Sequence, residues 1–402
     1  MISFAELIGH AKTGVFVWSM GITQHPWGAD GVRMVLNAAL ARGFIGRDKC
    51  GVMPIRGHSS VQGGAEMGAY ATAFPGGLAL NPTNAANLSQ HYGFDIPDWN
   101  GLATTEMVEA CHRGELDVFY MLGGNFLRTL PDPDYVAECL ERVPFRVHQD
   151  IMVTDQMLLD PSDEVILLPA QTRYEQTDGG TETSTERRVM FTPEIPREVG
   201  EARAEWRILR EVAIAADPAR AHLFGCETGQ AIRNEIARVV PFYDGIQNLT
   251  KSGDAFQYGG PHLCAGGVCA TDDGRAHLTA VALPPVGGRP EGVFHVSTRR
   301  GKQFNTLIYA EIDPLNNAPR DAVLMNADDA AARHLKQGDP VVLKNSLGTY
   351  AARVHLAPLA PGNLQVHWPE GNHLLDRHRK DAGGGVPDYN ALVELEITST
   401  GS

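Results

Sequence analysis

The amino-acid sequence predicts an α/β protein with a mainly parallel sheet, followed by a domain that is mostly β. Over residues 15–169, strand-like apolar runs alternate with helix-like patterns, and glycine-rich polar loops follow several of the strands. This order is typical of an open parallel sheet. After the linker P-P-V-G-G-R-P at residues 284–290, short strand patterns follow one another with one short helix among them. A compact barrel is predicted there.

Length and charge limit the possible classes of protein. A chain of 402 residues favours two or three domains. Apolar residues make up 43% and charged residues 20%, with no apolar stretch long enough to span a bilayer, so we expect a soluble protein without a membrane span. The net charge of -14 argues against nucleic acid as a partner. The first residues lack the pattern of a secretory signal, which favours a cytoplasmic location.

In the parallel-sheet part, the first strand is V-F-V-W at residues 15–18, which runs into Ser-Met-Gly. Apolar residues at helical spacing then predict a helix between Asp30 and Gly43. The later elements expected are strands at 117–122, 145–148 and 164–168 and a helix at about 132–142. The stretch 172–290 is rich in glycine, proline and charge, with one expected helix at 206–216. We expect it to wrap the sheet rather than form its own core.

In the C-terminal part, strands are expected at 323–326, 341–344, 350–355 and 364–367, with a short helix from about Asp328. Turns at 337–339 and 360–363 separate them. The six cysteines are scattered, and only Cys264 and Cys269 lie close together, as C-A-G-G-V-C. Zinc and iron–sulfur sites usually show tighter pairs in sets. We therefore expect free thiols, no metal ligands and no iron–sulfur cluster in this chain.

Two segments carry chemical information. M-G-I-T-Q-H at residues 20–25 follows a strand directly, and alone it could be any turn at a strand end. P-I-R-G-H-S-S-V-Q-G at residues 54–63 offers forked donors from arginine, histidine and glutamine, and its glycines allow close approach of a ligand. This second segment suits an anionic cofactor that forms hydrogen bonds.

In order, these two segments and the intervening G-F-I-G-R-D-K-C-G-V-M resemble the molybdopterin oxidoreductase family, in the branch that contains the formate dehydrogenases. The resemblance continues through Y-M-L-G-G-N at 120–125, H-Q-D at 148–150 and the region 175–188. It ends in a segment similar to the family's dinucleotide-binding domain. It therefore covers essentially the whole chain.

The resemblance implies three domains. Residues 1–60 would be the C-terminal part of a dinucleotide-binding α/β domain, and residues 61–290 a second α/β molybdopterin-binding domain with the wrapping segment. Residues 291–402 would be a double-psi-type β-barrel that binds the dinucleotide. The implied cofactor is molybdopterin guanine dinucleotide, with two copies per molybdenum or tungsten in the full enzyme. Its pyrophosphates need N–H groups, its guanine a carboxylate, and its pterin amide and guanidinium groups.

The site residues are carried over position by position. Arg56 matches an arginine beside the metal that would orient an anionic substrate, with a surface salt bridge as the alternative. His58, where formate dehydrogenases carry an amide, is the second catalytic candidate. The cofactor-binding candidates in the α/β part are Met20, Gly21, Gln24, Gly57, Gln62, Gly123, Gly124, Asn125, Gln149, Asp150 and Thr154. Those in the last domain are Thr298, Arg299, Gln303, Asn305, Asn372, Tyr389 and Asn390.

Two alternatives stay open for single residues. Asp150, predicted near a guanine, could instead be a helix N-cap, and each residue of the last domain could lie in a surface hairpin. In space, we expect Arg56 to face a cleft between lobes with the loop 20–24 beside it. The loop 298–306 and Asn372 should point toward the same cleft, because one cofactor must touch both domains.

The leading functional hypothesis is part of a molybdenum or tungsten oxidoreductase that removes two electrons from formate or a similar small substrate. The alternative is a non-catalytic cofactor-binding fragment or subunit that needs a separately encoded N-terminal half. The resemblance implies that the metal ligand lies in such a half, and that electrons leave through it or through an electron-transfer subunit. An ordinary nucleotide-binding protein is disfavoured because G-x-G-x-x-G and G-x-x-x-x-G-K-[ST] are both absent from the sequence.

Overall fold

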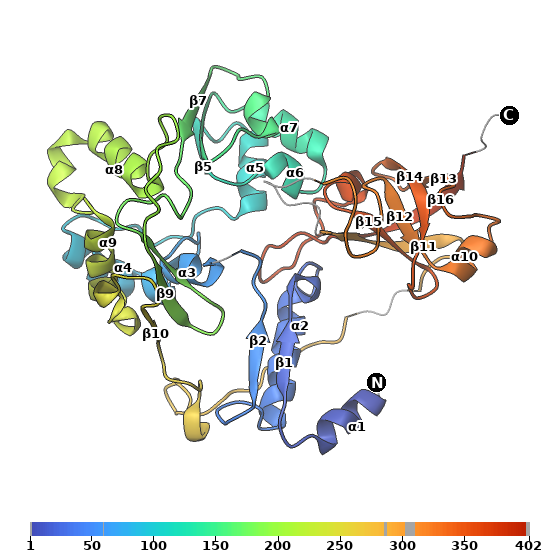
Figure 1. Ribbon diagram of the computed structural model, residues 1–402, viewed down its shortest axis with the longest axis horizontal. Helices are drawn as coiled ribbons and strands as arrows, with labels where there is room; N and C mark the ends of the chain where they lie inside the picture. The colour runs from blue at the N-terminus through green and yellow to red at the C-terminus, as the bar shows by residue number, and fades with distance from the viewer. Residues whose placement is uncertain (1, 59, 285–287, 302–309, 399–402) are drawn as a thin grey trace.

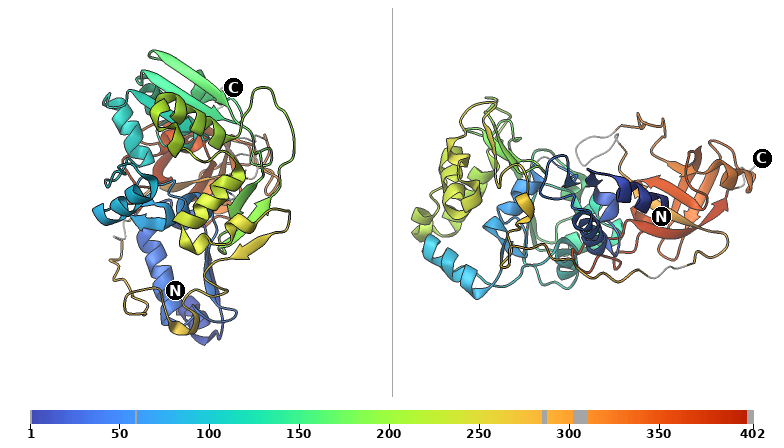
Figure 2. Two further views of the ribbon diagram at one scale, coloured as in Figure 1. Left: turned by 90° about the vertical axis from the view of Figure 1, so that its left-hand side faces the viewer. Right: turned by 90° about the horizontal axis from the view of Figure 1, so that it is seen from below.

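The computed structural model describes residues 2–58, 60–284, 288–301 and 310–398 (Figure 1). The C-terminal barrel and the lobe with strands β8, β9 and β10 lie at opposite ends of the long axis (Figure 2). A small N-terminal unit lies between them. No helix in the described ranges is long and apolar enough to cross a membrane.

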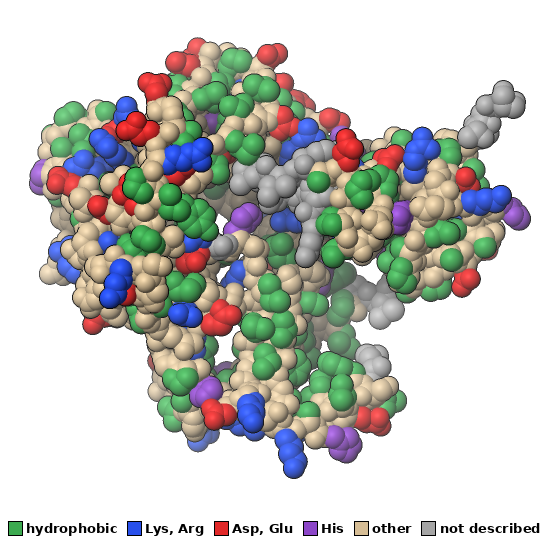
Figure 3. All heavy atoms as spheres, in the orientation of Figure 1, with side chains coloured by type: hydrophobic (Ala, Val, Ile, Leu, Met, Phe, Trp, Pro, Cys, Tyr) green, Lys and Arg blue, Asp and Glu red, His purple; other side chains and the backbone are tan. Residues whose placement is uncertain are grey.

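The N-terminal unit contains the first predicted strand and helix. It consists of α1 (Ile2–His10), β1 (Val15–Trp18), α2 (Gly28–Ala41) and β2 (Gly51–Pro54). Strands β1 and β2 pair in parallel over their whole length. Parallel sheets are normally covered on both faces. Here one face is open: Val15 and Val17 of β1 are 50% and 49% exposed. Phe4 and Leu7 of α1 are also exposed, at 62% and 69%. Figure 3 shows hydrophobic side chains gathered over this unit.

The middle lobe contains the predicted parallel sheet. Strands β5 (Val118–Leu122), β6 (Phe145–Asp150) and β7 (Glu164–Pro169) pair in that order, all in parallel. Helices α5 (Thr104–His112) and α7 (Pro133–Glu141) pack on the sheet through a buried apolar cluster that includes Leu140. Helix α7 begins where the sequence predicts, because the Asp132 carboxylate accepts a hydrogen bond from the Tyr135 amide.

Helix α4 (Pro82–Tyr92) was not predicted, although the sequence marks both of its ends. Asn81 caps its first turn, Pro82 follows, and Gly93 closes it in the left-handed conformation. The other elements of this lobe are α3 (Val61–Glu66), β3 (Ala73–Phe74), β4 (Leu78–Ala79) and α6 (Phe126–Thr129). The remaining short 3-10 helices are η2 (Pro75–Gly77), η4 (Pro218–Leu223), η5 (Pro241–Tyr243), η6 (Ile246–Asn248) and η7 (Ala265–Gly267).

The prediction that residues 172–290 have no core of their own was wrong. Strands β8 (Gly180–Thr183), β9 (Arg188–Thr192) and β10 (Ala255–Gln257) form an antiparallel sheet. Beside the predicted α8 (Glu205–Ala216), a second helix α9 (Gly229–Val239) is present. A buried cluster joins the sheet to the segment after α9: Val189, Phe191, Val240, Tyr243, Ile246 and Leu249. The apolar runs that build this core are too short to stand out among glycine, proline and charge.

The C-terminal domain is a closed barrel, as predicted. Its strands are β11 (Val293–Arg299), β12 (Ala322–Met325), β13 (Pro340–Lys344), β14 (Thr349–Leu356), β15 (Asn363–His367) and β16 (Asn390–Ile397). They close in the order β11-β15-β12-β14-β13-β16, with β11–β15 and β12–β14 parallel and the other pairs antiparallel. This is a double-psi-type barrel with an apolar interior. The short helix α10 (Ala327–Ala331) was predicted, whereas strands β11 and β16 were not.

The barrel docks on the middle lobe through buried hydrogen bonds. Asn372, in η8 (Glu370–Leu374), is 1% exposed, and its side-chain amide donates to the carbonyls of Arg128 and Leu130, each at 3.1 Å. The Tyr389 hydroxyl donates to the Thr129 carbonyl at 2.6 Å. The contact fixes the position of the barrel relative to the strand-end loops of the lobe.

One buried group predicts a pH-dependent loss of stability. His148 of β6 is 1% exposed and neither ring nitrogen has a hydrogen-bond partner among the described residues. Burial and the Arg146 charge lower the His148 pKa to about 4. Because the folded pKa lies below the unfolded value, the unfolded state binds the proton more readily, and stability falls as pH drops from about 6.5 toward 4. We expect the neutral, buried His148 to lower the free energy of unfolding by about 2 kcal/mol at pH 5 relative to pH 7.

Urea denaturation at both pH values gives the change in the free energy of unfolding for the wild type and for His148→Leu. The difference between these two changes is the contribution of His148. His10→Gln is the matched control, because His10 is exposed at the end of α1. Equal pH dependence in the wild type and His148→Leu would contradict the prediction.

Candidate functional site

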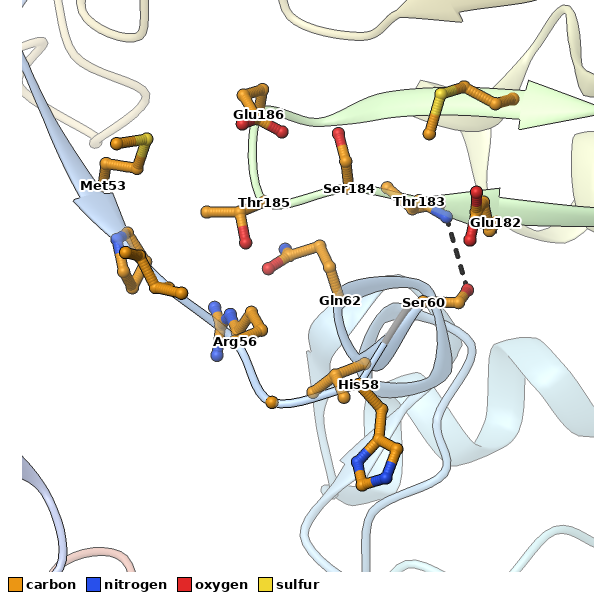
Figure 4. Close-up of a pocket in the computed structure, with 15 residues that line it drawn as sticks. Met53, Arg56, His58, Ser60, Gln62, Glu182, Thr183, Ser184, Thr185 and Glu186 are labelled. Carbon is orange, nitrogen blue, oxygen red and sulfur yellow. Dashed lines mark hydrogen bonds between the residues drawn. The ribbon is translucent and has the colours of Figure 1, made fainter. Parts of the chain in front are cut away.

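The largest group of predicted site residues lines a cavity of about 350 Å³. One wall is the segment from β2 to α3, which carries Arg56, His58 and Gln62. The other wall is the end of β8 and the turn that joins it to β9 (Figure 4). It contributes Glu182, Thr183, Ser184, Thr185 and Glu186.

Arg56 is exposed at the end of β2 and lines this cavity. Within the described ranges, Arg56 has no hydrogen-bond or ion-pair partner, so the salt-bridge alternative finds no support. The imidazole of His58 also lines the cavity but extends away from the β8–β9 turn (Figure 4). The guanidinium is therefore available to an anion in the cavity, whereas the catalytic role of His58 stays a prediction.

The loop with Met20 and Gly21 lies beside this segment, as expected. It forms η1 (Met20–Ile22), and a Cβ atom built on Gly57 would lie 3.8 Å from the Met20 sulfur. The Ser19 hydroxyl donates to the Ile55 carbonyl at 3.3 Å. On its far side, the Gln24 carbonyl accepts hydrogen bonds from the Tyr389 amide and the Asn390 side chain, at 3.2 and 3.4 Å. This loop thus joins the Arg56 segment to the barrel.

The loop after β5 has the open backbone that the prediction requires. Gly123 and Gly124 have φ values of 68° and 77°, and a Cβ on either would meet no atom within 4 Å. Asn125 is buried and caps α6, since its side-chain oxygen accepts from the Arg128 amide and its nitrogen donates to Asp155. Asn125 therefore has a structural role, and the glycines leave space for a ligand.

The predicted site residues at and after the end of β6 differ in their burial and hydrogen bonding. Gln149 is fully buried, where its amide accepts from the Tyr120 hydroxyl and donates to the Glu205 carbonyl. Asp150 is the last residue of β6 and not a helix N-cap, so that alternative was wrong. Burial raises its pKa. Thr154 takes the N-cap position of η3 (Asp155–Leu158), and its buried hydroxyl has no partner within the described ranges.

In the barrel, Thr298 and Arg299 lie in β11 rather than in a loop, because the strand extends to Arg299. The Arg299 guanidinium pairs with the buried Asp313 at 2.8 Å. Gln303 and Asn305 lie outside the described residues. Asn372 and Tyr389 bind lobe carbonyls, as given above, although the Asn372 side-chain oxygen is buried without a partner among the described residues.

The second wall of the cavity was missed as a set of site residues. Its residues form the run T-E-T-S-T-E at 181–186, a concentration of hydroxyl and carboxylate groups inside the stretch predicted to wrap the sheet. Arg173 pairs with Glu182 and holds this carboxylate at the edge of the wall. A hydrogen bond from the Ser184 side chain, followed by one from the Glu186 backbone amide, lowers the pKa of Glu186. A run of this kind on a turn is the feature that could have revealed the wall.

Comparison with known proteins identifies the family. The molybdopterin oxidoreductase family matches residues 2–215, and the molydopterin dinucleotide binding domain matches residues 294–393. The chain belongs to the molybdopterin oxidoreductase family. The first match contains the Arg56 segment and the strand-end loops of the middle lobe. The second coincides with the barrel, which contributes Tyr389 and Asn390 to the Gln24 contact.

Relatives in this family match most of the chain. "Protein YdeP" of Escherichia coli is 28% identical over 98% of this chain and 53% of its own length. "F420-dependent formate dehydrogenase subunit alpha" of Methanocaldococcus jannaschii is 27% identical over 89% of this chain and 53% of its own. The chain thus spans about half the length of these relatives. Acetylene hydratase from Pelobacter acetylenicus, at 14% identity and a TM-score of 0.52 over 79% of this chain and 51% of its own, has a similar fold.

Proposed function

We propose that this chain forms part of a molybdenum or tungsten oxidoreductase that binds molybdopterin guanine dinucleotide and oxidises formate or a similarly small anion. The observation that carries the proposal is Arg56, which lines a cavity beside the Met20 loop and has no hydrogen-bond or ion-pair partner among the residues that the structure describes. A guanidinium presents a planar fork of donors that matches a carboxylate. The F420-dependent formate dehydrogenase subunits among the relatives favour formate as the substrate.

The residues around the cavity fit the chemistry of the cofactor. Gln62 offers an amide group to a pterin, and the open backbone at Gly123 and Gly124 suits a phosphate. Asp150 would face a guanine. When bound, the metal and its pterin supply the two-electron redox chemistry. Arg56 would bind the substrate carboxylate and orient it in the cavity.

The test is analysis of cofactor content and turnover in the assembled enzyme, that is, this chain together with the remainder of the proposed oxidoreductase. Purified enzyme should contain molybdenum or tungsten, release GMP on hydrolysis, and reduce an artificial dye when formate is added. Protein that lacks both metal and pterin would contradict the proposal. Full cofactor content without formate turnover would support the proposed cofactor and exclude formate as the substrate.

A second candidate is a cofactor-binding part that is inactive until it joins a separate polypeptide. The exposed apolar face of β1 and α1 favours it, because large apolar patches mark interaction surfaces. The proposed partner is an α/β polypeptide that covers this face and supplies the metal ligand. An electron-transfer subunit would complete the assembly.

This second candidate predicts that the 402-residue chain purified alone has no formate-dependent dye reduction and retains little molybdopterin. One side of the binding site alone cannot hold the cofactor in place, because an ordered site needs supporting residues on both sides of the ligand. Metal analysis and dye reduction on the pure chain, with and without the candidate partner, measure this. Stoichiometric metal together with turnover in the chain alone would contradict it.

A further inference from the structure

A hydrogen-bond network lies behind the cavity and joins its two walls. At its centre is Glu66, the last residue of α3, which is partly buried. One Glu66 oxygen accepts hydrogen bonds from the Gln62 amide and the Tyr258 hydroxyl, and the other accepts from the Tyr243 hydroxyl at 2.5 Å. Three donors thus converge on one carboxylate. Of these, only Gln62 also lines the cavity.

The direction of each bond in this network follows from the chemistry of its partners. An ionised carboxylate can only accept, so Tyr243 must donate its proton to Glu66. The Thr183 hydroxyl lies 2.7 Å from the Tyr243 oxygen and must therefore donate to it. Burial, followed by the hydrogen bond to Glu66, raises the pKa of Tyr243 and of Tyr258, which keeps both protons in place. The network has one polarity, toward Glu66.

The same reasoning fixes the side-chain amide of Gln62. Its NH2 group must face Glu66, so its oxygen faces away. No donor in the described residues bonds to this oxygen. Figure 4 shows Gln62 extending between Arg56 and Thr185, at the centre of the cavity. The cavity thus presents an acceptor from Gln62 next to the cation of Arg56.

Gly63 of α3 allows the two walls of the cavity to approach each other closely. A Cβ on Gly63 would lie 2.8 Å from the Ser60 hydroxyl oxygen, closer than Cβ atoms normally approach, and 3.1 Å from that of Thr183, which is a tight contact. The Thr183 amide donates to the Ser60 hydroxyl at 3.3 Å. Glycine at this position lets α3 pack directly on β8. The Glu66 network therefore connects two segments that are in direct contact.

We infer that Glu66 is a positioning residue that holds the Gln62 amide oxygen toward the cavity, so that Gln62 takes a ligand group with an N–H or O–H donor while Arg56 stays available to an anion. The inference rests on the proposed function, since a pterin has such donors, whereas the formate anion has none. Gln62 would thus bind the cofactor and Arg56 the substrate. Glu66 itself does not line the cavity.

Glu66→Gln in the assembled enzyme tests this inference. A neutral amide cannot accept from three donors, and its own NH2 would confront one of them. Gln62 is then free to turn its NH2 toward the cavity. We expect the affinity for the pterin cofactor, measured as pterin and metal retained per polypeptide, to fall about 10- to 100-fold, because an NH2 group that meets a ligand N–H leaves buried donors without an acceptor. The KM for formate in the fraction that keeps cofactor should stay within about twofold, since Arg56 is untouched.

An exchange variant separates positioning from a general loss of structure. In Gln62→Glu with Glu66→Gln, the residue at position 62 again directs an acceptor to the cavity while position 66 supplies the donor. This double variant should regain cofactor retention relative to Glu66→Gln. The matched control is Glu109→Gln, because Glu109 accepts from the Tyr135 hydroxyl at 2.8 Å in α5, away from the cavity. It should retain cofactor as the wild type does.

Two results would overturn the inference: wild-type retention in Glu66→Gln, or no recovery in the double variant although it folds with wild-type circular dichroism. Wild-type enzyme without any pterin would instead contradict the proposed function. In that case neutron diffraction from the Glu66→Gln chain, which distinguishes the amide nitrogen from the oxygen, decides the positioning role. A Gln62 oxygen still directed toward the cavity in that structure would overturn it.

Discussion

Replacing Arg56 by alanine in the assembled enzyme is expected to lower kcat/KM for formate by about 10²–10³-fold. Arg56 is the one arginine or lysine among the described residues that line the cavity, so its loss leaves no neighbouring cation of this kind to replace it. Its guanidinium would act on the substrate rather than on the fold. Steady-state dye reduction with the metal content matched between variants measures the effect. Arg56→Lys should recover only part of the loss, because an ammonium lacks the planar fork.

The matched control for Arg56 is Arg33→Ala. Arg33 lies on α2 and pairs with Asp30 one turn away, with 49% of its side chain exposed. Loss of such a surface pair changes little. We expect wild-type turnover and thermal stability for Arg33→Ala. If Arg56→Ala kept wild-type kcat/KM at equal metal content, the substrate-binding role of Arg56 would be excluded.

The alternating part of the fold could be predicted because its signals are local. The apolar run at residues 15–18 and the helical spacing before Gly43 each indicate one element, and both elements are present. Strand β16 and the sheet β8–β10 were missed, because their stability comes from partners distant in sequence. Residues 188–192 become a strand only where Val189 and Phe191 meet the apolar residues after α9. Propensity alone does not contain that information.

The candidate site divides in the same way. Arg56 and Met20 were predicted to lie together because both motifs resemble pterin-side segments of the family, and the parallel pair β1–β2 brings the two segments to one edge. The opposite wall, from Glu182 to Glu186, comes from a hairpin whose position depends on long-range packing. Glu66 was missed for the same reason, since its partners Tyr243 and Tyr258 lie far along the chain.

Asn372→Ala is expected to destabilise the lobe–barrel junction by roughly 2–4 kcal/mol. Asn372 was predicted as a cofactor contact from a resemblance, and the structure shows its amide donating to the Arg128 and Leu130 carbonyls at 1% exposure. Alanine would leave both carbonyls without a donor, and water could reach them only by opening the junction. Urea denaturation of the full chain measures the loss, and limited proteolysis at the junction should increase with it.

The matched control for Asn372 is Asn363→Ala. Asn363 also donates to two carbonyls, those of Ala360 and Pro361, but within one partly exposed turn. Water replaces these bonds, so we expect a change within about 0.5 kcal/mol. Equal, small losses in both variants would show that the junction is already open to solvent. A large loss of bound pterin in Asn372→Ala without a loss of stability would instead assign the residue to the cofactor, through the side-chain oxygen that is buried and unpaired among the described residues.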